Sequence, residues 1–64
     1  MKTETEIKNQ IILYISRVEE ISGEPTMQDW KTYEQHKRNL DEICEGNPKL
    51  YELAIKQLVK KMRI

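Results

Sequence analysis

The apolar positions of the chain fall into three stretches that have helical spacing. In the first stretch, large apolar residues recur every three or four positions and form one stripe: Ile7, Ile11, Tyr14, Ile15, Val18 and Ile21. This period is typical of an amphipathic α-helix, whereas a half-buried strand would alternate at every second residue. It predicts a helix over about residues 5–22, and Gly23 fits the left-handed position that often closes a helix.

The second stretch has a narrower apolar stripe. Trp30, Tyr33, Lys37, Leu40 and Cys44 follow one another at spacings of three, four, three and four. This spacing is that of a coiled-coil seam and predicts a helix over about residues 26–45. The methylenes of Lys37 can lie along the seam while its amine reaches solvent. Alternatively, that amine can meet a carboxylate of another chain.

The third stretch has a broad apolar face and predicts a helix over about residues 48–63. Its apolar positions are Leu50, Tyr51, Ala54, Ile55, Leu58, Val59 and Met62. Asn47 followed by Pro48 is the favoured order at a helix start. Thr26, with Asp29 three residues later, resembles a capping box at the start of the second helix.

Short breaks separate the three stretches, and they contain the glycines and prolines of the chain. Because short connections favour antiparallel neighbours, we expect an all-α fold, an up-down-up three-helix bundle that forms one domain over residues 1–64. A chain of 64 residues can bury only a small core. Homodimerisation, in which one helix reaches into a second subunit, is therefore an alternative way to complete the bundle.

His36 and Cys44 are the candidate metal ligands or reactive groups. They lie eight residues apart on one predicted helix, about 12 Å, which is too far for them to share a metal. Since the chain has one cysteine, it cannot form an internal disulfide. We expect no metal and no cofactor, a surface position for His36 at the margin of the seam, and a buried, apolar role for Cys44.

Charge narrows the classes of partner. Eleven basic and eleven acidic residues give a net charge of zero, which argues against general binding of nucleic acid or acidic membranes. No apolar run approaches the ~18 residues that a membrane span needs. The start of the chain is acidic and polar, unlike a secretory signal. We therefore expect a cytoplasmic protein.

Three large apolar residues, Ile12, Leu13 and Leu53, lie away from the main stripes. Either the bundle buries a wider arc than one stripe, or these residues form an exposed patch for a partner. Trp30 offers the same choice: packing in the core is the favoured interpretation, and anchoring at an interface is the alternative. Together with Lys37, these residues are the candidate partner-binding positions.

The predicted third helix also carries a candidate basic face, formed by Lys49, Lys56, Lys60, Lys61 and Arg63. The favoured interpretation is a solvated helix face. The alternative is the recognition helix of a helix-turn-helix. In that motif the first turns read the bases, whereas the cations here concentrate at the far end.

These patterns favour binding over chemistry. No glycine-rich phosphate loop and no catalytic triad order occurs in the sequence, so we expect a protein without enzymatic activity. The predicted function is a small regulator, inhibitor or adaptor of a bacterial or phage cytoplasm, and its partner is another protein. The alternative is a helix-turn-helix-like DNA-binding protein that uses the basic face.

Overall fold

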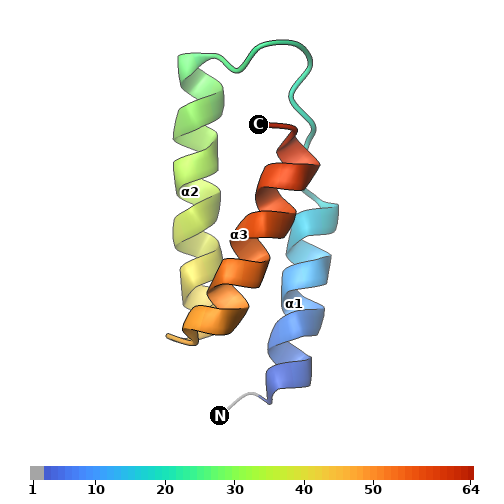
Figure 1. The fold of residues 1–64 in the computed structure, drawn as a ribbon, viewed down its shortest axis with the longest axis vertical. Helices are drawn as coiled ribbons and strands as arrows, with labels where there is room; N and C mark the ends of the chain where they lie inside the picture. The colour runs from blue at the N-terminus through green and yellow to red at the C-terminus, as the bar shows by residue number, and fades with distance from the viewer. Residues whose placement is uncertain (1–2) are drawn as a thin grey trace.

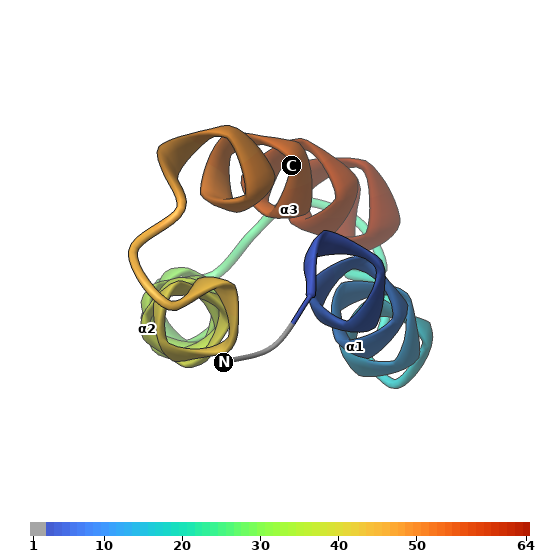
Figure 2. The same ribbon diagram turned by 90° about the horizontal axis from the view of Figure 1, so that it is seen from below.

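A computed structural model describes residues 3–64, which form three helices: α1 (Glu4–Ser16), α2 (Met27–Cys44) and α3 (Pro48–Met62). The helices run up, down and up, so α1 and α3 are parallel and α2 is antiparallel to both (Figure 1). Seen from below, they occupy the corners of a triangle (Figure 2). The predicted up-down-up three-helix bundle is confirmed, and all three of its helices come from one chain. Within residues 3–64, no helix is long and apolar enough to cross a bilayer.

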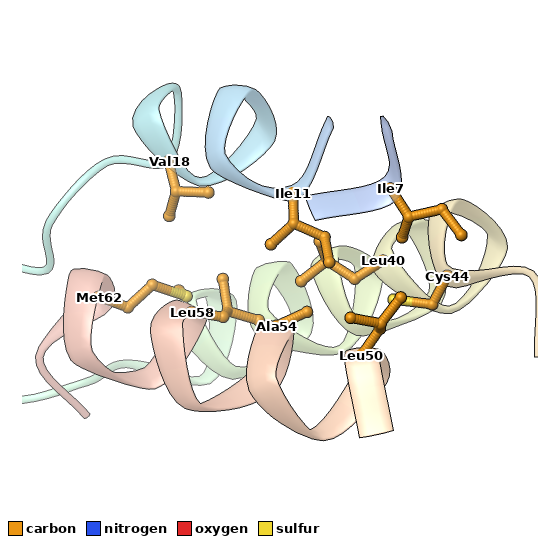
Figure 3. Close-up of a cluster of buried hydrophobic side chains, with 9 residues drawn as sticks. All are labelled: Ile7, Ile11, Val18, Leu40, Cys44, Leu50, Ala54, Leu58 and Met62. Atoms are coloured by element: carbon orange, nitrogen blue, oxygen red, sulfur yellow. The ribbon is translucent and has the colours of Figure 1, made fainter. Parts of the chain in front are cut away.

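The core lies between the three helices (Figure 3). Within residues 3–64 its buried side chains are Ile7, Ile11, Val18, Leu40, Cys44, Leu50, Ala54, Leu58 and Met62. Leu40 and Leu58 have no exposed surface, and Cys44 is buried beside them, as the sequence predicts. Burial raises the pKa of the Cys44 thiol, and the nearby Asp41 carboxylate raises it further. Cys44 is therefore a neutral, apolar part of the core.

The starts of α2 and α3 confirm the predicted caps. The hydroxyl of Thr26 accepts a hydrogen bond from the Asp29 amide, and the Asp29 carboxylate accepts one from the Thr26 amide at 2.8 Å. At the next helix, the Asn47 side chain accepts from two free amides of the first turn, and Pro48 occupies the following position. These side chains satisfy backbone groups that a helix leaves without internal partners.

The end of α1 differs from the prediction, because the helix stops at Ser16 and residues 17–22 are not helical. A helix continued to residue 22 would place Glu19 and Glu20 in its last turn, where the helix dipole disfavours negative charge. Gly23 does adopt a positive φ of 86°, but it lies within the linker and does not close α1.

The linker of residues 17–26 instead packs against the end of α3. Val18 is buried in the core, and Ile21 lies against it. The Ile21 amide donates a hydrogen bond to the carbonyl of Met62 at 3.2 Å. All residues of the predicted apolar stripe of the first stretch thus lie in or against the core, but Val18 and Ile21 reach it from a non-helical segment.

Candidate protein-binding surfaces

Five large apolar side chains are exposed in the described part of the chain. They are Ile12 (66% exposed), Leu13 (59%), Met27 (77%), Trp30 (48%) and Leu53 (41%). For Ile12, Leu13 and Leu53, the structure therefore supports the exposed alternative over a wider buried arc. The five side chains do not form one patch, however, because they lie on three different surfaces of the bundle.

The first surface is a groove between α1 and α3, which lie side by side (Figures 1 and 2). Ile12 and Leu53 line a hollow of about 250 Å³ there, and a hollow of about 200 Å³ continues it toward the ends of both helices. We call this surface the α1–α3 groove; its lining residues are Lys8, Ile11, Ile12, Ile15, Ser16, Leu53, Gln57 and Lys61.

Sequence reasoning did not single out Lys8 and Gln57 as part of this surface. A signal was present, because Lys8 lies one turn before Ile12 and Gln57 lies one turn after Leu53. The sequence does not show that these two helix faces meet.

Leu13 lies on a different surface. It lines a shallow hollow between α1 and α2, together with Tyr14, Arg17 and Ile43. Adjacent residues of a helix point about 100° apart, so Ile12 lies on the side of α1 toward α3 and Leu13 on the side toward α2. The structure therefore brings Ile12 and Leu53 together and separates Leu13 from them.

The third surface is the outer side of α2, where Met27 and Trp30 line a hollow with charged neighbours. The favoured prediction that Trp30 packs in the core is wrong. A straight helix drifts about 20° per heptad from a seam, so Trp30, two heptads before Cys44, points about 40° away from it. Tyr33 remains packed against the core, and the two rings meet edge to face at 5.9 Å.

Lys37 is half-buried on the seam of α2 and contacts groups of its own chain. Its ammonium lies 5.3 Å from the centre of the Tyr33 ring and 3.5 Å from the Glu34 carboxylate. This arrangement agrees with methylenes that lie along the seam and an amine that reaches solvent.

The basic face of α3 is partly neutralised. Lys49, Lys56, Lys60 and Arg63 are exposed, and Lys61 is half-buried. Lys56 pairs with Glu52 at 3.5 Å, and Arg63 pairs with Glu20 at 3.8 Å. The helices α2 and α3 run antiparallel side by side (Figure 1), whereas a helix-turn-helix crosses its two helices at about 90–120°.

A polar cluster joins α1 to α2, and it includes His36, which is half-buried beside the seam of α2. The Tyr14 hydroxyl lies 2.6 Å from His36 Nδ1, and the Asn39 amide donates to the same hydroxyl at 2.8 Å. Partial burial lowers the pKa of His36. Because His36 and Asn39 of α2 both bond to the Tyr14 hydroxyl of α1, the cluster fixes the two helices in register.

No group of three or more histidine, cysteine, aspartate or glutamate side chains with metal-binding geometry occurs in residues 3–64. Comparison of the chain with protein-family models, with curated proteins and with solved structures gave no significant match. The function is therefore inferred from the chemistry of the three surfaces.

Proposed function

We propose that this chain is a non-enzymatic protein-binding module, which acts as a regulator, inhibitor or adaptor in a bacterial or phage cytoplasm. One observation carries the proposal: Ile12 and Leu53 are exposed next to each other in the α1–α3 groove. Contact with a partner would remove this apolar surface from water, which favours association by about 25 cal/mol per Å² buried before the costs of binding.

The polar groups of the bundle support binding over catalysis. The hydrogen bonds that join Tyr14 to His36 and Asn39 hold α1 against α2. The Cys44 thiol is buried, and its raised pKa keeps it in the unreactive, protonated form.

Affinity capture from the native host with four forms of the chain tests the proposal. The forms are the wild type, a groove variant (Ile12→Lys with Leu53→Lys), an α2 variant (Met27→Lys with Trp30→Lys) and a control (Thr5→Lys with Gln28→Lys). The control adds the same charge at exposed polar positions. We expect a protein that the wild type and the control retain and that the groove variant loses.

The captured protein is then purified, and its affinity for each form is measured. We expect the groove variant to bind at least about tenfold more weakly than the control, since truncating central apolar contacts has effects of this size. Equal affinity for all four forms would contradict the proposal. Binding to duplex DNA that falls steeply with salt and is lost on Lys56→Glu with Lys60→Glu would support the DNA-binding alternative instead.

A further inference from the structure

We infer that the α1–α3 groove binds an acidic amphipathic helix of another protein. This inference rests on the proposed function and adds to it the surface that is used and the chemistry of the partner. Three properties of the groove carry it: its length, its apolar walls and the sign of the charges at its two ends.

The groove has the dimensions of a short helix-binding site. Its lining runs from Lys8 to Ser16 on α1 and from Leu53 to Lys61 on α3. The two helices are parallel (Figure 1), and each wall spans nine residues, about 12 Å, or roughly two turns of a bound helix. A partner helix with apolar residues at positions i, i+3 or i+4, and i+7 presents one apolar row of that length.

The walls of the groove are largely apolar. Ile12 and Leu53 line the hollow nearer Lys8 from opposite helices, and Ile11 and Ile15 form the floor of the groove toward the core. Gln57 lies between the two ends, where its amide can bond to a polar side chain at the edge of a bound helix.

The charges of the groove are basic at both ends. Among the described residues, the charged side chains that line it are Lys8 at one end and Lys61 at the other, and no carboxylate lines it. Lys8 is paired with the exposed Glu4 at 3.4 Å, whereas Lys61 is half-buried against the groove. A partner that carries Asp or Glu on each side of its apolar row would complement both lysines.

The same charges argue against a second copy of this chain as the occupant. A two-fold symmetric dimer would place the groove against itself and bring its lysines toward those of the other copy. Such a contact would bury like charges next to each other, which costs free energy. A helix of another protein avoids this repulsion.

Two synthetic peptides of about 14 residues test the inference, each bridged on its outer face because free helices of this length are marginal in water. Both carry the same leucines at i, i+4 and i+7. One has glutamates flanking this row and the other has lysines. In NMR titrations of the full chain, we expect the acidic peptide to shift the methyl signals of Ile12 and Leu53 and the amide signal of Gln57. The basic peptide should bind at least about tenfold more weakly.

Variants of the chain separate charge recognition from apolar contact. Leu53→Asn should weaken binding of the acidic peptide at least about tenfold, whereas Met27→Asn, on the outer side of α2, should leave its affinity unchanged. Lys8→Glu with Lys61→Glu should reverse the preference, so that the basic peptide now binds more tightly. Melting curves establish that each variant is folded.

The inference is overturned if neither peptide binds, if both bind the wild type equally, or if the shifts lie on α2. It is also overturned if the mass in solution is that of a dimer and the groove variant (Ile12→Lys with Leu53→Lys) is a monomer. The proposed function still stands in these cases if the α2 variant, Met27→Lys with Trp30→Lys, loses a protein that the wild type captures from the host. A captured partner that binds all four forms equally contradicts the proposed function itself.

Discussion

At the scale of residues, the hydrogen bonds of Tyr14 bear on the protonation of His36. The Asn39 amide donates to the Tyr14 oxygen, so the hydroxyl proton of Tyr14 is available for His36 Nδ1 at 2.6 Å. In a neutral imidazole, Nδ1 can accept this proton. Protonation of His36 would turn both ring nitrogens into donors and would require the hydroxyl to reorient.

We therefore predict that the bundle loses stability as the pH falls below about 6.5, the ordinary pKa of histidine. Burial lowers the pKa of His36 in the folded state, so the unfolded chain binds more protons between that pKa and 6.5. The free energy of unfolding is then highest above this window and falls as the pH drops through it. Urea titrations across this range measure the effect.

The control for this prediction is His36→Gln, which keeps a hydrogen-bonding side chain but does not titrate. We expect a weaker pH dependence for this variant than for the wild type in the same window. Identical profiles for the two proteins would show that His36 does not couple pH to stability.

A second prediction at the residue scale concerns Leu40, which is fully buried in the core. We expect Leu40→Ala to lower the free energy of unfolding by about 2–5 kcal/mol, because it removes packed methyl groups and leaves a cavity. In a bundle of this size such a loss approaches the total stability. The matched change Leu13→Ala, at a side chain that is 59% exposed, should lower the free energy of unfolding far less in the same urea titration.

At the scale of elements, the helix starts are fixed locally and the end of α1 is not. Thr26 and Asn47 bond to amides within their own helices, so each start needs only neighbours in the sequence. By contrast, the segment after Ser16 is tied by Ile21 to the carbonyl of Met62, a residue distant in the sequence. Its conformation therefore depends on the completed bundle.

We predict that Thr26→Ala destabilises the bundle by about 1 kcal/mol, because it removes one half of the capping box of α2. The measurement is the free energy of unfolding in urea. The control is Thr5→Ala, an exposed threonine inside α1. A loss of stability for Thr5→Ala as large as that for Thr26→Ala would show that the cap is not the cause.

At the scale of the whole molecule, the bundle is complete within one chain. Side chains from all three helices and from the linker meet in one core, and Val18 closes it near the end of α3 (Figure 3). Folding to this structure is a unimolecular reaction, whereas a bundle that exchanged a helix with a second subunit would gain stability with concentration.

We therefore predict a melting temperature that does not depend on protein concentration over about a hundredfold range. Circular dichroism at the two ends of that range, with the mass in solution measured at each, makes the comparison. A melting temperature that rises with concentration, together with a dimer mass, would favour the alternative in which homodimerisation completes the bundle.

The sequence by itself determined the helices, their order and two of their starts, because periodicity and capping are local properties of the chain. It also identified Ile12, Leu13 and Leu53 as apolar residues outside the stripes. Only the tertiary structure decided where α1 ends, since Val18 and Ile21 leave the helix to cover α3.

The tertiary structure likewise decided how the exposed residues are grouped. Ile12 and Leu53 lie in one groove, Leu13 lies on another surface, and Trp30 lies outside the core. The physical reason is that a helical pattern fixes directions around one axis only. Which faces of two helices meet depends on how all three pack together, and that packing brought the lysines of the α1–α3 groove beside its apolar walls.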